Sequence, residues 1–102
     1  TTSAVPEVKS SLLLNQNHPN PFNPATSIEF SVDKTQSLSI DVYDVQGMLV
    51  RQLVSETFSE GTHQVVWDGK NDAGRMVSSG VYFSRVTPES GVPVSRKMVL
   101  AK

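Results

Sequence analysis

Apolar and polar residues alternate along much of the chain, which is the period of a half-buried β-strand. The alternation is clearest in residues 26–32 and 37–44. The side chains expected to point inward from these two segments are Ile28, Phe30, Val32, Leu38, Ile40 and Val42. No segment shows a convincing period of 3.6 residues, so the pattern predicts strands and no helices.

Five further segments complete a predicted set of seven strands, with turn signals such as Gly47 and Glu60-Gly61 between them. These strands are predicted at residues 11–16, 48–56, 63–69, 81–87 and 94–102. Seven short strands spaced about 8–12 residues apart indicate an all-β fold, an antiparallel sandwich of the immunoglobulin or fibronectin-III type. We expect residues 1–11 to be a linker and residues 12–102 to be the sandwich. Trp67 is predicted to anchor its core, with one hydrogen-bond partner for the indole N–H.

Length and composition support a single globular domain. The chain has 102 residues, 37% of them apolar and 19% charged, which argues against disorder. The net charge of −1 gives no basic excess, so neither a nucleic-acid partner nor membrane insertion is predicted. The absence of cysteine excludes disulfides and thiol catalysis. No apolar run approaches the roughly 18 residues of a membrane helix, and the polar N-terminus is no signal peptide. If the protein is exported, we expect the export signal on a longer parent chain.

The sequence predicts no catalytic centre and no cofactor. Two histidines are present, His18 and His63, and neither lies near a recognisable nucleophile or orienting carboxylate in the sequence. His63 opens a predicted strand and is expected at its rim.

One polar loop, residues 68–75, offers weak candidates for a calcium site, because calcium prefers oxygen ligands. The candidates are Asp68, Asn71 and Asp72. The spacing of a known calcium loop is missing, and no glutamate follows at the right distance. We therefore favour turn chemistry, in which Asp and Asn side chains accept local backbone N–H groups and Gly69 and Gly74 adopt positive φ.

Exposed aromatic residues would favour a carbohydrate-binding module. Tyr43 lies on the polar face of its strand, and either Tyr82 or Phe83 must point outward because the two are adjacent. The sequence does not place their strands side by side. A carbohydrate-binding or spacer module of an extracellular hydrolase therefore remains an alternative function.

Residues 18–25, "HPNPFNPA", form a proline-rich segment before a well-defined strand. Proline fixes φ and pushes the preceding residue toward extended conformations, so we expect polyproline-like geometry along a sheet edge. We expect the edge to lie between the strands at 11–16 and 26–32. Asn20 and Asn23 would bind nearby backbone, and Phe22 would plug the end of the core.

Five separated blocks in order resemble the type A C-terminal sorting domain of the bacterial type IX secretion system. The related immunoglobulin-like domain of the flagellar hook-capping protein shares the third and fourth blocks. The resemblance covers about residues 12–102. The blocks are Asn20-Pro21-Phe22-Asn23-Pro24, Tyr43-Asp44-x-x-Gly47, Trp67-Asp68-Gly69, Ser79-Gly80-Val81-Tyr82 and Lys97-Met98-Val99-Leu100-x-Lys102.

This resemblance implies a non-catalytic sorting signal at the C-terminal end of a large secreted enzyme or adhesin. The parent would enter the periplasm by its own signal peptide and be recognised by the outer-membrane secretion translocon. A sortase-like protease would remove the sorting domain by cleavage within about residues 1–12. The cargo would remain at the cell surface or outside the cell.

The last predicted strand is the candidate recognition site. As an edge strand, it would offer a partner its row of backbone groups and its basic side chains through strand addition. The alternative is a plain closing strand whose lysines guard the edge. The candidate recognition residues are Arg96, Lys97, Met98, Val99, Leu100 and Lys102.

Overall fold

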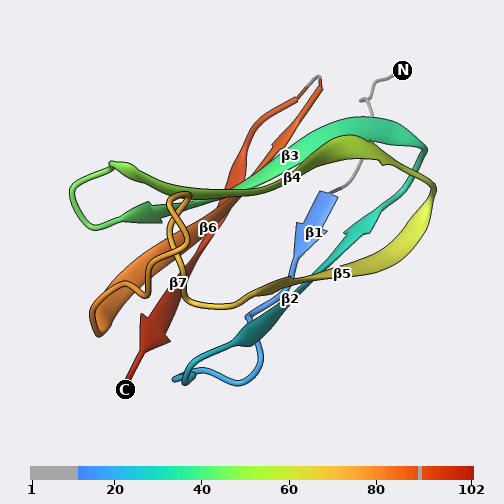
Figure 1. Ribbon diagram of the computed structural model, residues 1–102. Helices are drawn as coiled ribbons and strands as arrows, with labels where there is room; N and C mark the ends of the chain where they lie inside the picture. The colour runs from blue at the N-terminus through green and yellow to red at the C-terminus, as the bar shows by residue number, and fades with distance from the viewer. Residues whose placement is uncertain (1–11, 90) are drawn as a thin grey trace.

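The computed structural model describes residues 12–89 and 91–102, which form two antiparallel sheets packed as a sandwich (Figure 1). The three-stranded sheet has the order β1-β2-β5, and the four-stranded sheet has the order β4-β3-β6-β7. The strands are β1 (Leu12–Leu14), β2 (Thr26–Val32), β3 (Gln36–Asp44), β4 (Leu49–Phe58), β5 (Gly61–Trp67), β6 (Gly80–Pro88) and β7 (Val94–Leu100). The predicted seven-stranded immunoglobulin-like sandwich is confirmed. The predicted linker, residues 1–11, lies outside the described residues.

Strand boundaries follow the predicted pattern with local differences. β2 has the predicted bounds, whereas β1 is only three residues long. Beyond it the Asn15 N–H still donates to the Glu29 carbonyl at 3.0 Å, and the buried Asn17 donates through its side-chain amide to the Thr26 hydroxyl at 2.9 Å. β4 extends to Phe58, whose ring packs edge-on against Phe30 with 5.0 Å between centroids. No helix among the described residues is long and apolar enough to cross a membrane.

The core lies between the sheets and is built from the inward residues of each strand. The side chains of Ile28, Phe30, Ile40 and Val42 are fully buried, as predicted. Burying a side chain of this size contributes roughly 1.5–3 kcal/mol, which explains why strict alternation selects this fold. Trp67 is also fully buried, and its indole N–H donates to the Lys70 carbonyl at 2.9 Å. The predicted core anchor and its single hydrogen-bond partner are both confirmed.

Candidate partner-recognition site

The segment between β1 and β2, residues 15–25, lies along the edge of β7, and we call it the clasp. The Phe22 N–H donates to the Val99 carbonyl at 2.9 Å, and the Ala101 N–H donates to the Phe22 carbonyl at 2.9 Å. The side chain of Asn20 accepts from the Val99 N–H at 2.9 Å. The amide of Gln16 donates to the Lys97 carbonyl at 2.8 Å. The clasp therefore joins the two sheets of the sandwich at one edge.

Phe22 is the anchor of the clasp. Its side chain is 2% exposed, and its ring packs on Trp67 with 5.4 Å between centroids and an interplanar angle of 56°. The prediction that Phe22 plugs the core is confirmed.

The backbone of the clasp differs from the prediction. It bends at residues 19–21 and 23–24 and is not an extended polyproline-like run. The peptide bonds before its three prolines are cis. Both the Asn17 amide and the Thr26 hydroxyl donate to the Pro19 carbonyl, at 3.1 and 2.8 Å, which draws the segment back on itself. Asn20 does bind backbone, as predicted, but the backbone belongs to β7, at the other end of the chain.

β7 is an edge strand, as strand addition requires, but much of its outer edge is already bonded. The clasp uses the Lys97 carbonyl, both backbone groups of Val99 and the Ala101 N–H. At these positions the clasp already occupies the backbone groups through which a partner strand would pair. A partner can therefore contact residues 97–101 mainly through their side chains.

The candidate recognition residues divide into three groups. Met98 and Leu100 are buried in the core, at 0% and 1% exposure. Arg96 reaches back across the edge and donates through Nε to the Leu14 carbonyl at 2.9 Å. Lys97 and Lys102 are exposed, and Val99 is half-buried. The exposed side chains that a partner can contact are therefore those of Arg96, Lys97 and Lys102, with Val99 half-buried beside them.

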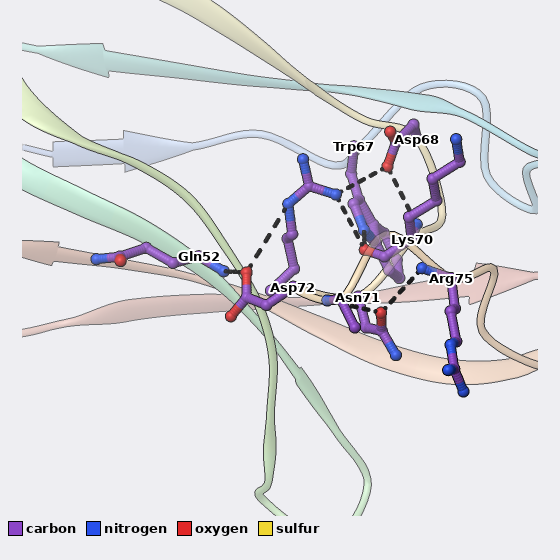
Figure 2. A network of polar contacts seen from close by, with 9 residues as sticks. Gln52, Trp67, Asp68, Lys70, Asn71, Asp72 and Arg75 are labelled. Atoms are coloured by element: carbon purple, nitrogen blue, oxygen red, sulfur yellow. Dashed lines mark hydrogen bonds and ion pairs between the residues drawn. The ribbon is translucent and has the colours of Figure 1, made fainter.

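The loop at residues 68–75 is held by turn chemistry (Figure 2). Asp68 accepts from the Lys70 N–H at 3.1 Å, and Asn71 accepts from the N–H groups of Ala73 and Arg75, both at 3.0 Å. Gly69 and Gly74 have φ of +79° and +82°, as predicted. Among the described residues, no three histidine or carboxylate side chains are grouped as a metal site.

Arg51 ties this loop to β4, and sequence reasoning missed it. Its Nη1 lies 3.1 Å from the Asp68 carboxylate, and its Nε lies 4.0 Å from that of Asp72. Asp72 in turn accepts from the Gln52 N–H at 3.1 Å and donates its own N–H to the Val50 carbonyl at 3.0 Å. The oxygens proposed for calcium therefore bind backbone groups and Arg51. A single arginine in an apolar strand was the only sequence signal for this contact.

The two histidines lie in different surroundings. The His63 ring lies against Phe30 and Phe58, with centroid distances of 5.6 and 5.0 Å, and Nε2 lies 2.6 Å from the Ser59 carbonyl. It is half-buried at the rim of the core, as predicted. His18 pairs through its backbone with Ser27.

The outward aromatic residue of β6 is Phe83. Tyr82 is 6% exposed and donates its hydroxyl to the Ser78 carbonyl at 2.7 Å, so it belongs to the core. Phe83 lies directly opposite Tyr43 of β3 on the outer face of the four-stranded sheet.

The family model of the FlgD Ig-like domain matches residues 20–91. The chain belongs to this family. The FlgD-type domain described here also shares its fold with a segment in the crystal structure of dimeric latent PorU from Porphyromonas gingivalis, with a TM-score of 0.76 and 16% sequence identity. The match covers 96% of this chain and 10% of the PorU chain. No curated protein matches the chain.

Proposed function

We propose that this FlgD-type domain is a non-catalytic C-terminal sorting signal of the type IX secretion system. It directs a larger exported protein from the periplasm across the outer membrane to the cell surface or the medium. Its partners are the outer-membrane translocon and a sortase-like protease that cuts the chain ahead of residue 12.

The observation that carries the proposal is the junction between the clasp and β7. Two of the sequence blocks that resemble a sorting domain, Asn20–Pro24 and Lys97–Lys102, lie far apart in the chain. In the structure they meet through the bonds of Asn20 and Phe22 to Val99. The second block also lies beyond residue 91, where the FlgD family match ends. This pairing favours a sorting domain over a hook-cap domain, because it accounts for both blocks as one unit.

The charge of the last strand supports recognition by side chains. Residues 94–102 contain three basic residues and no acidic ones, giving +3. Since the whole chain carries −1, the remaining residues carry −4. An acidic surface on the translocon would therefore be attracted to this end of the molecule and would meet the exposed side chains of Lys97 and Lys102.

Export of a reporter tests the proposal. A periplasmic reporter that carries a signal peptide is fused ahead of residues 1–102 and expressed in a type IX-secreting bacterium. We expect the reporter at the cell surface or in the medium, as with a known sorting domain. A reporter that stays in the periplasm, while the known domain exports it, would refute the proposal.

Charge reversal then locates the recognition surface. We expect the double change Lys97→Glu and Lys102→Glu to reduce export several-fold. The matched control is Lys34→Glu with Arg75→Glu, which reverses two exposed charges outside residues 94–102 and should leave export unchanged. Trp67 fluorescence reports whether each variant is folded, since the indole is buried only in the native core.

A further inference from the structure

The outer face of the four-stranded sheet gathers aromatic and basic side chains around Phe83. In the register of the sheet, Tyr43 of β3 and Lys97 of β7 lie directly opposite Phe83, one on each side. Arg85 lies two residues along β6 and therefore on the same face. Its guanidinium carbon is 5.7 Å from the centroid of the Tyr43 ring. Two rings and two cations thus occupy neighbouring positions on one face.

A shallow hollow lies at this place. It has a volume of about 230 Å³, and Tyr43, Phe83, Arg85, Asp44 and Ser95 are among its lining residues. Small-molecule pockets usually measure about 300–1,000 Å³, so this hollow suits a single ring of a longer chain rather than a whole ligand. A second hollow of about 510 Å³ at the other end of the face is lined by Ser39, Thr87, Glu89 and similar residues, without an aromatic ring.

The cations beside the hollow make no short ion pair among the described residues. Both ion pairs found among residues 12–89 and 91–102 are made by Arg51, so neither Arg85 nor Lys97 has a carboxylate within 4.0 Å in this part of the chain. Asp41 lies opposite Arg85 in the register, beyond 4.0 Å, and the two opposite charges attract each other at this distance. One oxygen of the Asp44 carboxylate accepts from the N–H groups of Gln46 and Met48 in its own turn.

We propose that this face binds an acidic polysaccharide, with one sugar ring stacked on Phe83. The C–H groups on the apolar face of a sugar carry partial positive charge and pack against the electron-rich face of an aromatic ring. The planar guanidinium of Arg85 pairs with the sugar carboxylate through two parallel hydrogen bonds, and Lys97 adds a point charge on the other side. The stacking of Arg85 on Tyr43 holds the guanidinium at the rim of the hollow, which lowers the entropy lost on binding.

Direct binding of the purified 102-residue chain tests this site. The probes are polygalacturonate, its fully methyl-esterified form, which keeps the sugar rings without the charge, and poly-L-glutamate, which keeps the charge without the rings. We expect polygalacturonate to bind more tightly than either of the other probes in calorimetry at one fixed salt concentration. Failure to bind polygalacturonate would overturn the proposal. Equal binding of poly-L-glutamate would do so too, and would assign the face to an acidic protein segment.

Variants then assign the contact residues. We expect Phe83→Leu, which keeps apolar bulk but removes the ring, and Arg85→Gln each to weaken binding at least about tenfold, as for residues at the centre of a small interface. The matched controls are Thr87→Ala at the other end of the same face and Lys34→Gln, which removes one charge elsewhere. Both should bind like the unchanged chain. Folded Phe83→Leu and Arg85→Gln variants that bind with unchanged affinity would overturn the assignment.

Discussion

The side chain of Asn20 accepts a hydrogen bond from the backbone N–H of Val99, 79 residues further along the chain, at 2.9 Å. Phe22 uses its own N–H and carbonyl to bind the same edge of β7. The clasp thus stands where a further strand would pair. It protects an otherwise open edge from pairing with another molecule, which is a recurrent hazard for sandwich proteins.

Replacing Asn20 tests the first of these bonds. Asn20→Ala leaves the Val99 N–H without its partner, and we expect a loss of about 0.5–1.5 kcal/mol in the free energy of unfolding, the usual range for one hydrogen bond. Urea unfolding followed by Trp67 fluorescence measures it. Asn23→Ala is the matched control, because Asn23 is an exposed asparagine in the same block, and its effect should stay within about 0.5 kcal/mol. Equal losses in both variants would contradict a specific role for Asn20.

Phe22 should contribute far more to the free energy of unfolding than Asn20 does. Phe22→Ala removes a ring that is 2% exposed and packs on Trp67, so it leaves a cavity at the end of the core. We expect a loss of about 3–5 kcal/mol in the free energy of unfolding, measured by the same urea titration. The control is Leu13→Ala, since Leu13 is 62% exposed and should matter little. A loss for Phe22→Ala no larger than that of the control would show that the clasp is not anchored through this ring.

The strands were predictable because their signal is local. In β2 and β3 the inward positions after the first residue of each strand are all apolar, so the two-residue period fixes which side is buried, although the first inward residues, Thr26 and Gln36, are polar. The inward face of β6 was ambiguous in the sequence, because the next buried position after Tyr82 is Ser84, a polar residue at 1% exposure. Without an apolar residue at that position, the pattern left open whether Tyr82 or Phe83 faces the core.

The position of the clasp was not predictable from local pattern. Its partners, Lys97, Val99 and Ala101, lie at the other end of the chain, and proline rules describe only φ and the residue before each proline. The same reasoning applies to Arg51, whose contacts with Asp68 and Asp72 depend on how the loop folds over β4. Local rules placed Gly69 and Gly74 correctly because a positive φ is a property of the turn itself.

Gly69 should be less tolerant of substitution than Gly74. Both have positive φ, which costs a residue with a side chain about 1–2 kcal/mol. A Cβ at Gly69 would also lie 2.7 Å from the carbonyl oxygen of Pro24 in the clasp, whereas nothing lies within 4 Å of a Cβ at Gly74. We expect Gly69→Ala to destabilise the domain clearly more than Gly74→Ala in thermal and urea unfolding. Equal losses would mean that the loop and the clasp are not in close contact.

The pH dependence of stability should carry a contribution from Asp41. Burial raises the pKa of this carboxyl above its ordinary value of 3.8, the negative charge of Asp72 raises the pKa further, and Arg85 opposes both. The folded state therefore binds this proton more tightly than the unfolded state does. The stability gained from that proton is fully present below pH 3.8 and is lost as the pH rises through the higher pKa of the folded state.

Asp41→Asn removes the charge and tests the direction of this pH dependence of stability. We expect the variant to be more stable than the unchanged chain at pH 7 in urea unfolding, because a partly buried carboxylate near Asp72 is no longer present. The gain should shrink at pH 3, where Asp41 is protonated in the folded state. Arg85→Gln should act in the opposite direction at pH 7, since it removes the charge that opposes the shift. The opposite result would be a stability difference between the variant and the unchanged chain that is less favourable to the variant at pH 7 than at pH 3. It would show that Arg85 lowers the pKa of Asp41 more than burial raises it.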